Sequence, residues 1–168
     1  MKMEEQIDSL EENWPEAIAP HTAFAATVQR LASLIHERSR HVLKAFELTF
    51  TEFDVLAALR TLPHGTILTP SALYDALLIS SGGLTKTLKS LEGRGLIERP
   101  QANEDARQRP IALTDAGRRL MEEILPKMQA MDKALLQDAF ASDDDCMAEA
   151  ELMRRIVMSV ESSLQRRL

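Results

Sequence analysis

Residues 69–114 read TPSALYDALLISSGGLTKTLKSLEGRGLIERPQANEDARQRPIALT, and this stretch predicts two short helices joined by a tight turn. Thr69 is a favourable N-cap and Pro70 suits the first helical position, so we expect a helix to begin there. Ser80 and Ser81 interrupt that helix and can cap a second one. The pattern is that of a helix-turn-helix.

The second helix is expected to have two chemically different faces. Its leucines recur at i, i+4 and i+7 and predict a buried face: Leu84, Leu88 and Leu91. The remaining side chains are hydroxyls and long cations, which suit hydrogen bonds to phosphates and base edges in a DNA major groove. We expect contacts from Ser81, Thr85, Lys86, Thr87, Lys89 and Ser90, with the lysines on phosphates and Thr85, Thr87 and Ser90 on bases.

A short β-hairpin with a charged tip is predicted after this helix. Gly93 and Gly95 end the helix, because its C-terminus favours residues that adopt positive φ. Residues 96–98 and 111–113 form the two strands, and the segment NEDARQR lies between them. A helix-turn-helix followed by such a hairpin is a winged helix-turn-helix, which can contact both grooves of one duplex.

The segments LTPSALYDALLISSGGLTKTLKSLEGRGLIER, DARQR and IALTDAGRRL together resemble the MarR family (multiple antibiotic resistance regulators). In that family an aspartate and an arginine of the wing lie nine and seven residues before a helix-opening threonine, and Asp105, Arg107 and Thr114 occupy these places. The resemblance implies that Arg107 enters the minor groove, where negative potential is concentrated. It implies that Asp105 orients Arg107 or fixes the wing by a salt bridge, and that Arg109 contacts phosphate or Asp105.

Apolar stripes on the flanking helices predict a two-fold dimer. We expect one domain over residues 1–168, mainly α with a small β-wing, in which residues 51–114 form the winged helix-turn-helix. Thr51 is expected to cap the helix before the reader, and Ser142 to open the last helix. Residues 19–47 and 115–168 carry apolar stripes that the wing region cannot cover, so a homodimer binding a pseudo-palindromic operator is favoured over a monomer.

Composition indicates a cytoplasmic protein without a membrane span. The formal net charge is −6, but residues 85–119 contain eight Lys or Arg against five Asp or Glu, so the predicted reader is locally basic. No apolar run approaches the roughly 18 residues that a span requires, and the acidic N-terminus lacks the features of a signal peptide. Cys146 is the single cysteine, which fits a reducing compartment.

The resemblance also implies a small-molecule effector, because MarR-type dimers commonly bind aromatic or phenolic anions between the dimer helices and the reader. A urate-responsive subgroup uses an N-terminal tryptophan, an aspartate in the sequence EFD and two arginines; Trp14, Asp54 and Arg99 stand at similar places. Thr87 stands where the other arginine is expected, which argues against urate itself. Asp54 also has a simpler interpretation as an N3 helix acid after Thr51, and Trp14 as a packed core residue.

Enzymatic activity, a cofactor and a metal site are not expected. The four histidines are scattered and have no metal-ligand spacing. Cys146 follows three aspartates, whose negative charge disfavours a reactive thiolate. The sequence therefore favours a DNA-binding transcription regulator, with a repressor released by a small aromatic ligand as the leading hypothesis. A DNA-binding dimer without an effector and a redox sensor based on Cys146 are the alternatives.

Overall fold

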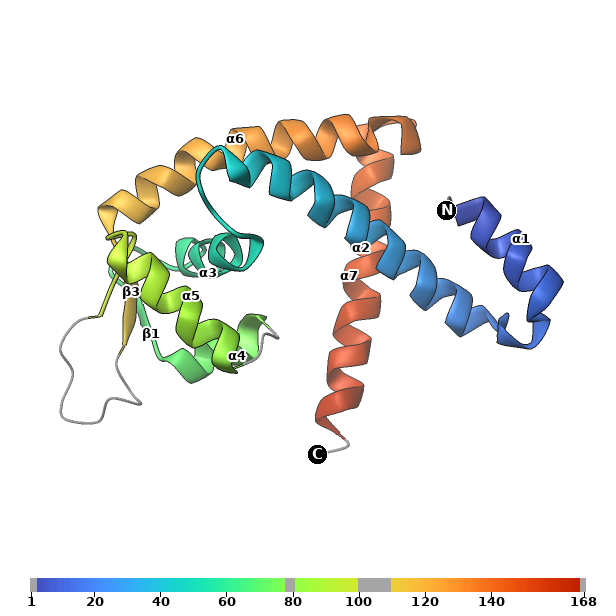
Figure 1. The fold of residues 1–168 in the computed structure, drawn as a ribbon, viewed down its shortest axis with the longest axis horizontal. Helices are drawn as coiled ribbons and strands as arrows, with labels where there is room; N and C mark the ends of the chain where they lie inside the picture. Colours follow the sequence, from blue (N-terminus) through green and yellow to red (C-terminus); the bar gives the residue numbers. More distant parts are fainter. Residues whose placement is uncertain (1–2, 78–80, 100–109, 167–168) are drawn as a thin grey trace. The chain divides into compact units, whose positions relative to one another are not determined.

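A computed structural model describes residues 3–77, 81–99 and 110–166, which form two compact units, residues 1–129 and 130–168 (Figure 1). The elements of the first unit are α1 (Met3–Asn13), η1 (Pro15–Ala17), α2 (Pro20–Lys44), α3 (Phe50–Arg60), β1 (Ile67–Leu68), α4 (Pro70–Leu77), α5 (Ser81–Gly93), β2 (Ile97–Glu98), β3 (Ile111–Leu113) and most of α6 (Asp115–Leu136). The second unit holds the end of α6, η3 (Gln137–Ala139) and α7 (Asp143–Gln165). None of the described helices combines the length and the apolar character that crossing a membrane requires. The predicted class, mainly α with a small β-wing, is confirmed.

Three of the predicted helix caps are confirmed. The hydroxyl oxygen of Thr69 accepts a hydrogen bond from the backbone N–H of Ala72 at 3.2 Å. Thr114 and Ser142 open α6 and α7 in the same way, accepting from backbone N–H groups three residues later at 3.0 and 3.1 Å. Such bonds satisfy donors that the first helical turn leaves without partners.

The predicted cap of α3 was wrong. Thr49, not Thr51, is the N-cap, and it forms a capping box with Glu52. Both threonines are good caps by residue type and both are followed by an acid three residues later, but only Thr49 has a glutamate there, the longer side chain that completes a capping box, whereas Thr51 has Asp54. Asp54 is consequently not the N3 residue of α3, so the simple explanation of that acid as a helix-start charge does not hold.

The sheet has one strand more than the hairpin predicted from sequence. Its order is β1–β3–β2, all antiparallel, with Ile67 opposite Ala112 and Ile97 opposite Leu113. β1 has only two residues, too few for alternation to reveal a strand. The sheet joins the segment before α4 to both arms of the hairpin, and it thereby fixes the base of the wing.

The core of the first unit lies between the helix-turn-helix, the sheet and the helices behind them. Its buried apolar side chains include Leu43 of α2, Val55, Leu56 and Leu59 of α3, Leu73 of α4, Leu84, Leu88 and Leu91 of α5, Ile97 and Ile111 of the sheet, and Met121, Ile124 and Met128 of α6. The leucine face predicted for α5 is therefore confirmed. α6 continues as one helix through Pro126.

Large apolar side chains outside this core are exposed. Phe24 and Leu31 of α2 are 46% and 43% exposed, and they lie seven residues apart on one helical face. Trp14, which could have been a core residue, is 63% exposed. The N-terminal helix α1 was not predicted, and it has no buried residue. A single copy of the chain thus leaves apolar surface uncovered.

Candidate nucleic-acid interface

Helix α5 separates its side chains into a buried and an exposed face, although not entirely as the sequence predicted. Thr85, Lys86 and Lys89 are exposed, as expected. Thr87 is only 9% exposed, because it lies three residues after Leu84 and four before Leu91 and so shares their face. The prediction that Thr87 reaches a base edge is corrected by this burial.

Ser90 also has a role that the sequence did not suggest. Its hydroxyl donates a hydrogen bond of 2.6 Å to Oε1 of Glu52, which is 6% exposed at the start of α3. The hydroxyl proton is therefore donated to another part of the protein, while Ser90 itself is exposed, so its contact with a base stays a prediction. We call the exposed residues Thr85, Lys86 and Lys89 of α5 the reading face.

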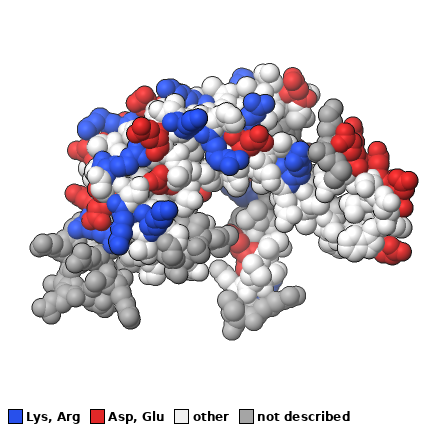
Figure 2. Space-filling model, in the orientation of Figure 1, with Lys and Arg blue, Asp and Glu red and all other residues white. Residues whose placement is uncertain are grey.

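The reading face is cationic. Within the described residues neither Lys86 nor Lys89 forms an ion pair, so their charges are available to an anionic partner. Figure 2 shows Lys and Arg side chains gathered over α5 and the neighbouring elements, and Asp and Glu along α1. The charge asymmetry predicted from sequence is thus present on the surface, where it can attract phosphate.

The wing residues Asp105, Arg107 and Arg109 lie outside the described residues, as does the side chain of Ser81. What the structure does place is the base of the hairpin. Ile97 and Ile111 are 1% and 0% exposed, so β2 and β3 are anchored in the core beside α5. The wing segment therefore begins and ends on a fixed support.

Comparisons with known proteins agree with this architecture. A profile of the MarR family matches residues 46–108. An HTH-type transcriptional regulator of Bacillus cereus is 31% identical over 127 residues, covering 76% of this chain and 82% of the relative. The chain belongs to the MarR family. The regulator PecS of Dickeya dadantii is 27% identical over 135 residues, covering 78% and 81% of the two chains.

Solved structures of MarR-family proteins share the fold. Apo MarR from E. coli has a TM-score of 0.68 at 21% identity, covering 83% of this chain and 98% of its own. The S. aureus MepR–DNA complex has a TM-score of 0.65 at 23% identity, covering 83% and 97%. NadR in complex with 4-hydroxyphenylacetate has a TM-score of 0.68 at 19% identity, covering 84% and 98%.

Of the three residues suggested for an effector site in this MarR-family chain, Asp54 has the most unusual surroundings. It lies half-buried on α3, and burial raises the pKa of its carboxyl above the ordinary value while His36 of α2 partly lowers it. The ring of His36 meets that of Phe50 edge-on at 4.2 Å between centroids, and Phe53 lies 6.3 Å beyond Phe50. A half-buried acid next to aromatic rings is a favourable environment for a polar aromatic molecule.

Trp14 and Arg99 are placed differently. Trp14 precedes η1, and the small apolar cavity of about 140 Å³ between α1 and α2 is lined by other residues. Arg99 forms an ion pair with Glu92, Nε to Oε2, at 3.4 Å. Within the described part of one copy, no hydrogen bond or ion pair joins any two of Trp14, Asp54 and Arg99. His36 and Phe50 are the neighbours of Asp54 that sequence reasoning missed, since the α2–α3 contact is not visible in the sequence.

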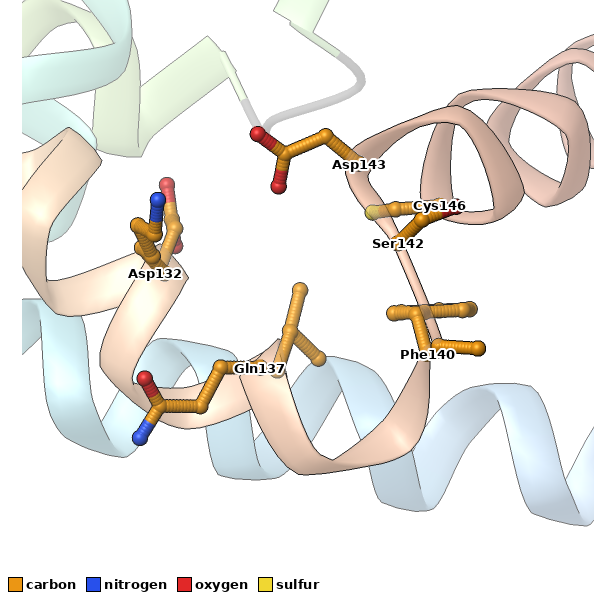
Figure 3. Close-up of a pocket in the computed structure, with 9 residues that line it drawn as sticks. Asp132, Gln137, Phe140, Ser142, Asp143 and Cys146 are labelled. Carbon is orange, nitrogen blue, oxygen red and sulfur yellow. The ribbon is translucent and has the colours of Figure 1, made fainter.

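A second cavity, of about 350 Å³, lies within the C-terminal unit where α6 turns through η3 into α7 (Figure 3). Its lining mixes apolar side chains such as Phe140 with the polar side chains of Asp132, Gln137 and Asp143, and Cys146 of α7 faces it. None of the predicted DNA or effector residues lines it. Over the described ranges, no three His, Cys, Asp or Glu side chains gather as metal ligands would.

Proposed function

We propose that this protein is a sequence-specific DNA-binding transcription regulator that acts as a homodimer. The observation that carries the proposal is the reading face of α5. Its two lysines have no ion-pair partner in the described structure, while the leucines on the other side fix the helix in the core. Such a helix can enter a major groove with its cations on the phosphates. The related fold of MepR, solved as a DNA complex, supports this role.

The contacts divide between helix and wing. Lys86 and Lys89 bind backbone phosphates, and Thr85 is the hydroxyl of the reading face that reaches a base edge. Ser81 at the start of α5 contacts phosphate. In the wing, the proposal rests on the sequence motif: Arg107 enters the minor groove, with Asp105 and Arg109 as its supporting residues.

Arg107→Ala is the direct test of this function. We expect binding to the specific site to weaken by about 1–3 kcal/mol, roughly 5- to 150-fold, because one inserted cation is lost from the groove. Fluorescence anisotropy would measure it on a duplex containing the site found by footprinting the promoter region next to the protein's own gene. Lys89→Ala is the comparison variant. Because it removes one phosphate contact, it should reduce the slope of log affinity against log salt concentration by about one. If Arg107→Ala changed neither affinity nor salt dependence, the wing assignment would be wrong.

We further propose that the dimer is a repressor released by a small aromatic or phenolic ligand that binds beside Asp54. Phe50 and Phe53 supply aromatic surface, and His36 supplies a cation for an anionic group when it is protonated. NadR, which has a similar fold, was solved with 4-hydroxyphenylacetate. Urate is not the expected ligand, because Thr87 is a buried hydroxyl where an anionic purine would require a cation.

Asp54→Asn separates a ligand role from a structural one. The folded-state pKa of Asp54 is raised, so the folded protein favours the protonated carboxyl. The stability that the protonated carboxyl contributes is lost as the pH rises through that pKa. At neutral pH the charged carboxylate therefore costs stability, and we expect Asp54→Asn to unfold at a higher temperature than wild type. The difference in melting temperature between Asp54→Asn and wild type should disappear at pH values below the ordinary pKa of an aspartate, near 3.8.

The ligand arm of the same experiment uses 4-hydroxyphenylacetate as the probe. If the ligand releases DNA from the wild-type protein, the coupling free energy between the two sites should be about 1–3 kcal/mol. Bound DNA must then lower the affinity for the ligand by the same factor by which the ligand lowers the affinity for DNA. Asp54→Asn should reduce this response more than it reduces DNA affinity without ligand. A variant that is less stable than wild type at neutral pH, with an intact ligand response, would restore the purely structural interpretation of Asp54.

A further inference from the structure

The C-terminal end of α5 is held by two polar anchors outside the reading face, Ser90 within the helix and Arg94 directly after its last residue. Ser90 donates to Oε1 of Glu52 at 2.6 Å. One turn later, Arg94 donates from Nη1 to the carbonyl oxygen of Glu47 at 2.7 Å and from Nη2 to that of Phe46 at 3.0 Å. These bonds span 38 to 48 positions of sequence, so they connect the end of α5 to the start of α3 and to the turn that follows α2.

Glu52 serves two helices with its two carboxylate oxygens. Oε2 accepts the backbone N–H of Thr49 at 2.8 Å and its hydroxyl at 2.9 Å, which completes the capping box of α3. A capping box needs only that oxygen, and Oε1 is left for Ser90. Burial alone would raise the pKa of Glu52, but the hydrogen bonds from Ser90 and Thr49 and the charge of Arg94 outweigh it and hold the pKa below its ordinary value. The carboxylate is thus kept charged, as a strong acceptor for α5.

Arg94 binds the end of α2. Glu47 has φ of +54°, and the N–H of Leu48 donates to the carbonyl of Leu43 while that of Glu47 donates to the carbonyl of Lys44. This is a Schellman motif, built on a residue other than glycine. The two carbonyls that Arg94 binds belong to this motif, at the negative end of the helix dipole. The guanidinium therefore joins the C-terminus of α2 to the residue directly after α5.

We propose that Glu52 and Arg94 are positioning residues of the DNA reader, which lock α5 to the start of α3 and the end of α2 and so set the angle of its reading face. We call Glu52, Ser90 and Arg94 the clamp. The clamp residues do not touch DNA in this proposal, and they act through the orientation of Lys86 and Lys89. The inference rests on the proposed DNA-binding function and adds a means by which a change in α2 reaches the reader.

Ser90→Ala is the cleanest test, because it removes the bond to α5 and leaves the capping box of Glu52 intact. We expect affinity for the footprinted duplex to fall about tenfold, the scale of one hydrogen bond to a charged group. The slope of log affinity against log salt should stay unchanged, since no phosphate contact is lost. Affinity for a random duplex should change little. Ser90→Thr, which keeps the hydroxyl, is the rescue variant.

A double-mutant cycle with Glu52→Gln decides between positioning and direct contact. If Ser90 acts through Glu52, Ser90→Ala should cost little further affinity in the Glu52→Gln background. Equal losses in both backgrounds would mean that the Ser90 hydroxyl touches DNA itself, and the clamp would be rejected. A fall in melting temperature without loss of preference for the specific duplex would also reject it, since that is what a merely structural role produces.

Arg94→Lys provides a second, independent variant. It keeps the positive charge but loses the planar fork that reaches two carbonyls, so we expect a partial loss of preference for the specific duplex. Wild-type protein that shows no preference for any promoter duplex would overturn the proposed function and the clamp together. Wild-type preference that survives in Ser90→Ala and Arg94→Lys would overturn the clamp alone.

Discussion

Gly117→Ala is expected to destabilise the protein by about 3 kcal/mol or more, at the upper end of what one added methyl group costs in a packed site. A Cβ at this position would lie 2.2 Å from the carbonyl oxygen of Leu96 and 2.7 Å from Cδ1 of Leu113. The first of these atoms belongs to the backbone at the start of the wing hairpin, so no side-chain rotation can relieve the contact. The helix or the hairpin must move.

The reason for this close approach is the joint between α6 and the hairpin. The hydroxyl of Thr114 lies 2.8 Å from the carbonyl oxygen of Gly95 and 3.0 Å from that of Leu96, and shares its proton between them. The same oxygen accepts the N–H of Gly117 at 3.0 Å. One threonine thus draws the first turn of α6 against the backbone before β2. The substitution should therefore disturb the base of the wing as well as global stability.

Gly93→Ala is the matched control, because a Cβ there meets nothing within 4 Å and Gly93 does not need positive φ. Alanine is the better helix former, so this variant should be neutral or more stable by up to about 1 kcal/mol. Urea unfolding followed by circular dichroism measures both variants. Equal stability of Gly117→Ala and Gly93→Ala would contradict the packing argument.

Local signals in the sequence were enough to predict the helix-turn-helix. The caps at Thr69, Thr114 and Ser142 depend on bonds that reach three residues along the chain, and residue type reveals such bonds well. Gly95 has φ of +68°, as predicted for the end of α5, whereas Gly93 is simply its last residue. The family motif added the wing, which periodicity alone would not have distinguished from any other hairpin.

The faces of α5 show where the sequence pattern was insufficient. Leu84, Leu88 and Leu91 define a stripe that includes position 87, so a stricter helical wheel would have placed Thr87 with the core. No local pattern could have shown that Ser90 bonds to Glu52, because the partners lie 38 residues apart. A polar residue at the edge of an amphipathic helix can face a buried acid or the solvent, and only the tertiary packing decides.

The effector residues could not be grouped from sequence for the same reason. Asp54 has a raised pKa, but its neighbour His36 comes from another helix, α2, where its ring meets that of Phe50 at the start of α3. Trp14 follows a helix that was not predicted, and in one copy its ring is largely exposed. A residue that is exposed in one copy can be covered only by a partner or a ligand, neither of which the sequence displays.

Val157→Glu is expected to raise the dissociation constant of the proposed dimer about a thousandfold or more. Val157, Val160 and Leu164 lie on one face of α7 and are 52%, 53% and 60% exposed in a single copy. Burying each such side chain contributes roughly 1.5–3 kcal/mol, and in a two-fold interface every residue counts twice. A carboxylate in the middle of this face would lose that burial in both copies and would have to be desolvated without a partner.

Sedimentation equilibrium at micromolar concentration measures the shift from dimer to monomer. Ser162→Glu is the matched control, since it adds the same charge to α7 at an exposed position on the opposite side from this face. The control should remain a dimer. Val157→Glu should also lose affinity for a duplex with two half-sites about 10 bp apart, because a monomer engages only one of them. A Val157→Glu protein that stays dimeric would show that this face of α7 is not part of the interface. A stable wild-type monomer that binds the duplex tightly would refute the two-fold mode of binding altogether.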